Sequence, residues 1–542
     1  MRAAWQDNFT PTSSENIPSD TRNEVNEFFT NNPSSTKYHD TIDFTRLNPN
    51  CEFSKAITPK EILNTIRSLS NKAPGEDQIC KPHLQHLPMS VIINLAHLFT
   101  ASLCCGYFPE NMKSAILIFV GKPGKSKFNP SNYRPISLLS MVIKIYEKIL
   151  TSRVTKFLED KGIEHKNQYG FRSGRSTTSC IAMNYEFISR HRTTHEHYKI
   201  SVIGRDIKGA FNHLWHPRVK WHLLNIGLPT ILAKTLCNFL DNRTARIRVG
   251  KHIGDPIQIL AGVPQGASPS AKIFNLVIRL SPLPPEAMYH QYDSNFADDC
   301  TQIIATPCSK KRGSNLHKIQ MTRAIERQNE FELQEGLITE PSKTWILPIK
   351  DKIRIPPSIN GQKYQVKRSD VKMLGLKLTY DNFITAHVKE KCAIARSELR
   401  KIKKTCGELN KESRMNMIRT KVLVQLTYPA IPLHLASKTQ MLKLQAVQND
   451  ALKFVHKVDH THRLTAKALH QRNPKIKPIN QVLYWRAKST WQAIEQGQAG
   501  NIKQLEKLLK LEIVKEDLSF PSSYEAAMKC PEPPPWYTRK KK

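Results

Sequence analysis

Apolar residues recur along the chain with the two periods that distinguish helices from strands. After the segment Thr58–Glu61, which has the residue types of a helix cap, they follow helical spacing until about residue 69, where a Lys-Ala-Pro-Gly stretch ends the pattern. A second helical pattern covers about 89–105, and the unbroken apolar run Ala115–Val120 has the length of a buried strand. The first ordered part of the chain is therefore predicted to mix helices with strands.

The middle of the chain continues with turns, strands and helices. Glycine and proline punctuate residues 121–135 in the manner of a hairpin, and a helix is predicted from about 137 to 160. The strand-like residues 201–206 lead into a helical pattern over 209–227. This order predicts a domain in which strands and helices follow one another closely.

The remaining patterns complete the outline. Alternation of apolar and polar residues near 289–305 predicts two strands joined by a tight turn at Asp298 and Asp299. Beyond residue 385 the pattern is mostly helical and basic, up to a Pro-rich end. Residues 1 to about 55 are rich in Ser, Thr, Asn and Pro, so they are predicted to be extended or disordered.

The charge balance points to an acidic partner. The 542 residues include 82 Lys and Arg against 46 Asp and Glu, a formal net charge of +36. Nucleic acid is the default partner of so positive a molecule, followed by a membrane surface or an acidic protein. The alternative is a basic protein whose charge serves solubility alone.

Cysteine and histidine usage argues against a zinc or disulfide framework. The eleven cysteines contain no CxxC pair, which fits a reducing compartment. The N-terminus has no apolar core of a secretory signal, and no apolar run reaches a membrane span, so we expect an intracellular protein of cytoplasm and nucleus, without a membrane. His191, His195 and His197 have no neighbouring Cys or carboxylate ligands and are predicted to be solvated loop residues.

Three aspartates have the positions that a nucleotidyl-transfer site requires. Asp206 ends a predicted strand, and Asp298 and Asp299 occupy a predicted hairpin tip. Two Mg²⁺ ions about 4 Å apart can deprotonate an attacking hydroxyl and neutralise a triphosphate, and Mg²⁺ prefers carboxylate oxygens. Adjacent aspartates repel one another in a turn unless a cation is present, although an Asp-Asp pair also occurs in many surface loops.

The order of the surrounding motifs makes the pair informative. DIKGAF (206–211) precedes AGVPQG (261–266), which precedes FADD (296–299), and this series resembles the polymerase motifs of reverse transcriptases from jockey-like non-LTR (LINE-type) retrotransposons. The resemblance extends over about 57–460 through further motifs, which are KAPGEDQI (72–79), KPGK and NYRPISLLS (122–140), QYGFRSGRST (168–177), EPSKT (340–344), MLGLKL (373–378) and the thumb-like LTYPAIPLHLAS and LQAVQNDALKFV (426–455).

The resemblance implies a fold and an activity. The fold would be α+β, a right-hand polymerase with fingers, a palm built on an antiparallel sheet, and a helical thumb. The activity would be RNA-directed DNA polymerisation, with an RNA template, a DNA primer, dNTP substrates and two Mg²⁺ ions, or Mn²⁺ in their place. The implied divisions are an N-terminal extension (1–56), N-terminal helices and fingers (57–200), the palm with a primer-grip hairpin (201–380), the thumb (381–460), and a basic helical region with a Pro-rich tail (461–542).

The resemblance also assigns roles at the reaction centre. Asp206, Asp298 and Asp299 would be the catalytic metal ligands. Phe211, five residues after Asp206, would lie under the sugar of the incoming nucleotide, where its ring would clash with a 2′-hydroxyl. The alternative interpretation of Phe211 is a core aromatic residue at helical spacing.

Further residues would bind the nucleotide. Gln265 would contact it, while Gly266 allows close backbone approach. Lys122 and Arg134, on the finger hairpin, would bind the triphosphate, although either could instead be a solvated surface charge. Lys343 matches the family's lysine near the leaving pyrophosphate.

The template and primer would have their own contacts. Leu374 and Gly375 resemble the tip of the primer grip, an apolar hairpin against the primer end. Arg172 and Arg175 would contact the template backbone, which gives affinity without sequence information.

The sequence departs from the family pattern in ways that leave a second function open. Asn212 stands where the family commonly has Asp, Arg205 replaces an apolar residue beside Asp206, and residues 292–296 are more polar than a central strand should be. No endonuclease, CCHC or RNase H pattern is found, so we expect a partial element or a separated reading frame. An inactive nucleic-acid-binding relic, or a domesticated polymerase, are the alternatives to an active enzyme, and the oligomeric state is unknown.

Overall fold

The computed structural model describes most of the chain from Phe53 to Pro533. The gaps are residues 127, 130–131, 195–196, 285–289, 309–312, 340–342, 351–357, 360–361, 368, 382, 459–464, 512 and 514–520. The predicted N-terminal extension therefore lies almost wholly outside the described residues, as do His195 and most of the EPSKT motif.

The chain divides into two compact units, and neither is one continuous stretch of sequence. The first consists of Met1–His165, Ile207–Pro282 and Arg327–Thr339, and the second of Lys166–Asp206, Leu283–Glu326 and Glu340–Lys542. Each unit is described by itself below.

The first unit contains a four-stranded sheet with helices around it. Its strands are β1 (Ser114–Gly121), β2 (Tyr133–Leu138), β4 (Thr244–Val249) and β5 (His252–Gln258), in the order β2-β1-β4-β5. Only the pair β1 and β4 is parallel. Its helices are α3 (Pro59–Ser68), α4 (Lys81–Gln85), α5 (Met89–Cys104), η3 (Glu110–Met112), α6 (Met141–Asp160), α8 (His216–Asn225), α9 (Thr230–Leu240) and α10 (Ser270–Ile278).

Local chemistry explains where these elements begin. The Thr58 hydroxyl accepts a hydrogen bond from the Glu61 amide, so α3 begins at the predicted cap. The prediction of a helix from 137 was wrong in its start: Tyr133–Leu138 forms β2, and Ser140 caps α6 through the Val142 amide. The prediction of a helix over 209–227 was also too long, because Gly209 has a φ of +56° and Pro217 marks the first turn of α8.

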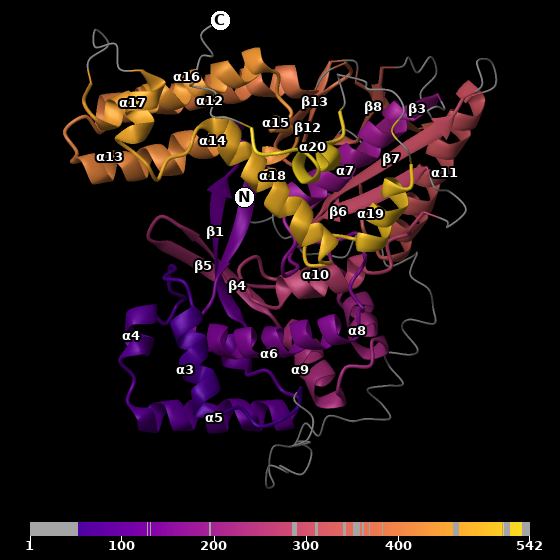
Figure 1. Cartoon of the computed structure of the whole chain (residues 1–542). Coiled ribbons are helices and arrows are strands. Elements are labelled where there is room, and N and C mark those ends of the chain that lie inside the picture. The colour runs from indigo at the N-terminus through magenta and orange to yellow at the C-terminus, as the bar shows by residue number, and fades with distance from the viewer. Residues whose placement is uncertain are drawn as a thin grey trace, which may run out of the picture. The chain divides into compact units, whose positions relative to one another are not determined.

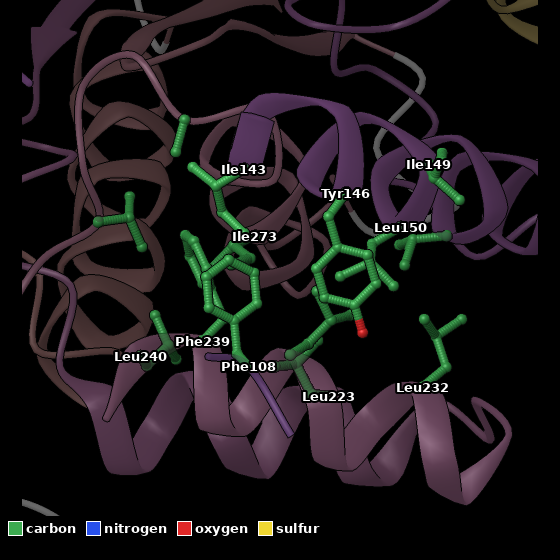
Figure 2. Packing of buried hydrophobic residues seen from close by; sticks show 14 of the residues in the cluster. Phe108, Ile143, Tyr146, Ile149, Leu150, Leu223, Leu232, Phe239, Leu240 and Ile273 are labelled. Atoms are coloured by element: carbon green, nitrogen blue, oxygen red, sulfur yellow. The ribbon is translucent and has the colours of Figure 1, made fainter. Parts of the chain in front are cut away.

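Aromatic residues fill the core between α6 and α9 (Figure 2). The Tyr146 ring stacks on Phe99 at 4.9 Å between centroids, and Phe108 meets Phe239 edge to face at 5.2 Å. All four side chains are buried. Burial of an aromatic or aliphatic side chain of this size contributes about 1.5–3 kcal/mol, so this cluster anchors the first unit.

The second unit is built on a five-stranded sheet of order β11-β8-β3-β7-β6. Its strands are β3 (Tyr198–Asp206), β6 (Gln291–Phe296), β7 (Asp299–Pro307), β8 (Trp345–Ile349) and β11 (Gln365–Val366). Two small antiparallel pairs accompany it, β9 (Ser358–Ile359) with β10 (Gln362–Lys363) and β12 (Asp370–Met373) with β13 (Leu376–Thr379). Strand β3 pairs antiparallel with both β7 and β8, so Asp206 ends a central strand.

Helices make up the rest of the second unit. They are α7 (Thr177–Thr193), α12 (Phe383–Thr405), α13 (Lys411–Met417), the π-helical η6 (Ile418–Leu423), α14 (Val424–Leu426), α15 (Ala430–Leu433), α16 (Lys438–Val455), α17 (Ala466–Gln471), α18 (Ile479–Glu495), α19 (Ile502–Leu509) and α20 (Ser523–Met528). Helix α11 (Gly313–Gln334) has residues in both units. None of the helices in the described part of the chain combines the length and apolar character needed to cross a lipid bilayer.

Strand β6 is polar because it is not central. The strand-order finding corrects our expectation that residues 292–296 would lie inside the sheet, since β6 is an edge strand. Its buried polar groups have partners nearby: Tyr292 hydrogen-bonds Tyr169 through the two hydroxyls at 2.8 Å, and the Ser294 hydroxyl donates to Asn184 at 2.9 Å.

The C-terminal helices complete the core beside α7. Helices α18, α19 and α20, drawn in yellow in Figure 1, pack against α7, drawn in purple. Trp491 of α18 is fully buried, and its indole N–H donates to the Ser523 hydroxyl at 3.1 Å. The described residues of α18, α19 and α20 are therefore part of the folded unit.

One histidine prediction was wrong. His191 is buried at the end of α7, where its ring packs on Phe187 at 4.2 Å between centroids and its Nδ1 lies 2.8 Å from the Phe187 carbonyl. Burial lowers the pKa of His191 to about 3, so the ring is neutral. His197 is exposed, as expected for a loop residue.

Candidate active site at the ends of β3 and β7

Two of the three predicted aspartates face each other across the sheet. Asp206, the last residue of β3, is the cross-strand partner of Asp299, the first residue of β7. Asp299 also closes the β6–β7 hairpin opposite Phe296, so Ala297 and Asp298 form the two-residue turn between them. The register of one sheet thus brings Asp206 and Asp299 together, with Asp298 next in the chain.

The turn is held in a demanding conformation by a residue that sequence reasoning overlooked. Ala297 has a φ of +55°, which is uncommon for a residue with a side chain. The Gln168 side chain holds it on both sides, since its Oε1 accepts from the Ala297 amide at 3.1 Å and its Nε2 donates to the Ala297 carbonyl at 3.3 Å. At Gly170 a Cβ would lie 2.3 Å from the Ala297 nitrogen, so only glycine fits. The QYGF motif (168–171) therefore holds the β6–β7 turn in place through Gln168 and Gly170.

The carboxylates repel one another. Desolvation by the surrounding protein, then repulsion from Asp298 and Asp206, raise the pKa of Asp299 to about 6, while Lys343 opposes the rise. Asp299 is exposed at the protein surface. This turn is therefore a place where added positive charge is favourable.

One cation of the chain already lies there. The Lys343 ammonium is 2.5 Å from the Asp206 carboxylate, and more than half of the lysine side chain is exposed. The contact neutralises part of the negative charge of Asp206. It also places the lysine predicted to act near the pyrophosphate beside the predicted metal ligands.

The donor set fits a divalent cation, although its side chains are not arranged as a closed ligand cluster. Within the described residues, no group of three His, Cys, Asp or Glu side chains is arranged to hold a metal ion. The oxygens of Asp206, Asp298 and Asp299 are the hard ligands that Mg²⁺ or Mn²⁺ prefers, and their repulsion is of the kind that a cation relieves.

Gln265 is fixed in the first unit by both its backbone and its side chain. The Ser137 amide donates to the Gln265 carbonyl at 2.9 Å, and the Gln265 Nε2 donates to the Asn212 Oδ1 at 2.9 Å. Gly266 has a φ of +135°, and a Cβ there would lie 2.7 Å from the Ser137 carbonyl oxygen. Asn212, which sequence reasoning treated only as a departure from the family, is therefore the side-chain partner of Gln265.

Phe211 lies at the edge of the core of the first unit. Its backbone carbonyl accepts from the Val263 amide at 2.7 Å, which connects the turn after β3 to the segment that leads to Gln265. The ring is half-buried and stacks on Phe274 of α10 at 5.3 Å between centroids. One face is thus packed, which agrees with both interpretations of Phe211, and its role stays a prediction.

The other predicted residues lie in four places. Lys122 and Arg134 lie where the chain leaves β1 and enters β2: the Lys122 amide donates to the Asn132 carbonyl, and the Arg134 side chain is exposed. Arg172 is half-buried, whereas Arg175 donates to the Lys166 and Gln168 carbonyls. The residues of the predicted primer grip form the turn between β12 and β13: they are Leu374 and Gly375.

Comparison with known proteins agrees with this geometry. Residues 120–378 match the profile of the family described as "Reverse transcriptase (RNA-dependent DNA polymerase)". This part of the chain is therefore a reverse transcriptase domain, and it includes the whole β3, β6 and β7 arrangement with its three aspartates.

The similar proteins come from insect transposable elements. The chain is 25% identical over 419 residues to the probable RNA-directed DNA polymerase from transposon X-element of Drosophila melanogaster. This alignment covers 76% of this chain and 45% of that protein. It is 26% identical over 439 residues to the probable RNA-directed DNA polymerase from transposon BS of the same species, covering 77% and 47%. Against the RNA-directed DNA polymerase from mobile element jockey, also from that species, it is 32% identical over 213 residues, covering 39% and 23%. The chain thus spans about half the length of the first two relatives.

Proposed function

We propose that the chain is an RNA-directed DNA polymerase of a jockey-like non-LTR retrotransposon, which extends a DNA primer along an RNA template with dNTPs. The observation that supports the proposal most directly is the cross-strand pair of Asp206 and Asp299 beside the turn at Asp298, within a reverse transcriptase domain. These carboxylates would be the catalytic metal ligands.

The proposed right-hand architecture assigns a task to each region. The sheet that contains β3 and β7 would be the palm, with the β12–β13 hairpin as its primer grip. The β1–β2 pair would be the fingers hairpin, and helices α12–α16 the thumb. Helices α18–α20 would brace the palm from behind α7, which their packing supports.

The chemistry divides between the bound ions and the chain. Two divalent ions, Mg²⁺ or Mn²⁺, would activate the primer 3′-hydroxyl and neutralise charge on the triphosphate. Asp206, Asp298 and Asp299 would hold them, and Lys343 would offer its ammonium to the leaving pyrophosphate. In the first unit, Lys122 and Arg134 would bind the triphosphate, and Gln265 with Gly266 would contact the nucleotide. Phe211 would exclude a 2′-hydroxyl.

The positive charge of the chain supports nucleic acid as its partner. Contacts of Lys and Arg with phosphates release counterions, so affinity should fall steeply as salt rises. Arg172 and Arg175 would contact the template backbone, and Arg175 also shapes its own loop, because it donates to the Lys166 and Gln168 carbonyls. Such a polymerase would act inside the cell, in cytoplasm and nucleus, on an RNA that the chain itself does not specify.

Primer extension on poly(rA)/oligo(dT) with the full chain tests the proposal. The wild-type chain should extend the primer with dTTP in the presence of Mg²⁺, and Asp298→Asn should abolish extension while binding the duplex with nearly wild-type affinity. Asp293→Asn is the matched control, because Asp293 is a buried aspartate of the adjoining strand β6 that accepts hydrogen bonds from Gln291. A wild-type chain that binds the duplex but does not extend it would identify an inactive relic.

A further inference from the structure

The turn between β12 and β13 is tight and partly strained. Leu374 and Gly375 have φ values of +49° and +82°, as a two-residue hairpin turn with the twist of its strands requires. Such a conformation costs little for glycine but about 1 kcal/mol or more for leucine. The position of this turn therefore depends on neighbours that hold it.

Tyr428 holds the turn through its hydroxyl and its ring. The hydroxyl donates to the Leu374 carbonyl at 2.7 Å. The ring lies so close to Gly375 that a Cβ there would be 3.1 Å from the Tyr428 Cε1. Tyr428 lies two residues after the end of α14, so a residue from the helical region fixes the backbone of the hairpin tip.

Three more contacts fix Tyr428 itself. The Thr177 side chain, at the start of α7, hydrogen-bonds the same hydroxyl. The ammonium of Lys391, on α12, lies over the ring at 5.4 Å from its centroid. His387, also on α12 and fully buried, accepts from the Lys377 amide of β13 at 3.1 Å and reaches the Tyr428 carbonyl at 3.4 Å.

The protonation state of His387 sets which of its ring nitrogens accepts and which donates a hydrogen bond. Burial and the neighbouring Lys391 lower the pKa of His387 to about 4, so the ring is neutral and its Nδ1 can accept from an amide. Its Nε2–H is then free to donate to the Tyr428 carbonyl. Tyr428 is thus connected to both sides of the hairpin, at the tip through its hydroxyl and at β13 through His387.

We propose that Tyr428 is a positioning residue for the primer terminus, which acts by fixing the backbone of Leu374 and of the exposed Gly375. The inference rests on the proposed function, because it treats this hairpin as the surface that contacts the primer. Gly375 is exposed while the flanking Met373 and Leu376 are buried, so the tip offers its backbone to a ligand. A movement of even 1 Å there would misalign the attacking hydroxyl without changing how the nucleotide binds.

Tyr428→Phe removes only the hydroxyl and keeps the ring against Gly375 and Lys391. Tyr484→Phe is the matched control, since the Tyr484 hydroxyl donates to another backbone carbonyl, that of Cys530, at 2.8 Å and away from the hairpin. In single-turnover extension of a poly(rA)/oligo(dT) duplex, Tyr428→Phe should lower the rate of dTTP addition about five- to twentyfold. The dTTP concentration at half-maximal rate should change less than about twofold, and Tyr484→Phe should match the wild type.

Hydrogen–deuterium exchange supplies a readout that needs no catalysis. Amides of residues 370–379 should exchange faster in Tyr428→Phe than in the wild type or in Tyr484→Phe, with the rest of the palm unchanged. Equal exchange in all three chains, or equal loss of rate in both variants, would overturn the role of Tyr428. A wild-type chain that extends no primer would contradict the proposed function instead, so the two failures are distinguishable.

Discussion

The second unit contains two clusters of acidic side chains that differ in how the chain satisfies them. Glu186, on α7, is fully buried and accepts hydrogen bonds from the Arg190 guanidinium and from Ser522, Ser523 and Tyr524. At the ends of β3 and β7, by contrast, Asp298 and Asp299 are accessible to solvent, and Lys343 is the basic side chain paired with Asp206.

The difference separates structure from function. The charge partner of Glu186 is Arg190, which also binds Glu525 of α20 at 2.8 Å, and this network fastens the C-terminal helices to α7. At the candidate active site the Lys343 ammonium pairs with Asp206, while desolvation and repulsion from Asp298 and Asp206 raise the pKa of Asp299 to about 6, a repulsion that a bound cation would relieve. The buried, paired charges around Glu186 stabilise the fold, whereas the repelling carboxylates at the ends of β3 and β7 mark the candidate active site.

The largest expected effect comes from the aspartates of the candidate active site. Asp299→Asn should lower the single-turnover rate of primer extension by about three orders of magnitude or more, because a carboxylate ligand of the catalytic metal ions is lost. The thermal unfolding midpoint should rise or stay unchanged, since the repulsion among the carboxylates falls. A chain that loses activity only because it unfolds would show the opposite shift in the melting curve.

A substitution in the buried cluster around Glu186 should instead lower the stability of the chain. Glu186→Ala should lower the free energy of unfolding by about 3–5 kcal/mol, because it leaves Arg190 buried without one of its two carboxylate partners. The surface pair of Glu398 and Lys401 supplies the control, and Glu398→Ala should cost less than about 0.5 kcal/mol. Denaturant melts measure both values, and a Glu186→Ala chain as stable as the control would remove the contrast.

In the first unit, a residue of the proposed site can be compared with a core residue through the two stacked rings of Phe211 and Phe274. Phe274 is fully buried, whereas Phe211 is half-buried and keeps one part of its ring accessible. Phe211→Val should lower the preference for dNTPs over rNTPs about ten- to a hundredfold, while Phe274→Leu should reduce stability and leave the preference unchanged. If both variants only destabilise the chain, Phe211 is core packing.

The smallest effect is expected at the partner of Gln265. Asn212→Leu should raise the KM for dNTPs about two- to tenfold, which corresponds to one lost hydrogen bond. Asn212→Asp keeps an acceptor for the Gln265 amide, so it should change the KM only slightly. A KM unaffected by the leucine substitution would mean that Gln265 is oriented by its backbone alone.

The sequence predicted the local elements of the site well, because they depend on short-range patterns. The strand that ends at Asp206 was predicted, and the turn predicted at Asp298 and Asp299 lies one residue earlier, at Ala297 and Asp298, since period-two alternation and an Asp-Asp turn are local signals. The start of α6 was misplaced because Tyr133–Leu138 is equally compatible with a strand, and the pairing with β1 that selects it is a long-range contact.

The tertiary partners of the site could not be predicted in this way. Gln168 holds Ala297 across 129 residues of sequence, and Tyr428 holds Leu374 across 54. No periodicity in a single sequence connects such positions. The polar residues of β6 were misjudged for the same reason, since only the strand order reveals that they lie at the edge of the sheet.

The most direct test of the account counts the metal ions bound at Asp206, Asp298 and Asp299. Electron paramagnetic resonance of Mn²⁺ bound to the chain with a primer–template and a non-incorporable nucleotide should detect two tightly held ions for the wild type. Asp299→Asn should lose at least one of them, and Asp293→Asn, which changes a buried carboxylate that accepts hydrogen bonds from Gln291, should lose none. Equal Mn²⁺ binding by the wild type and Asp299→Asn would contradict the assignment of the metal site.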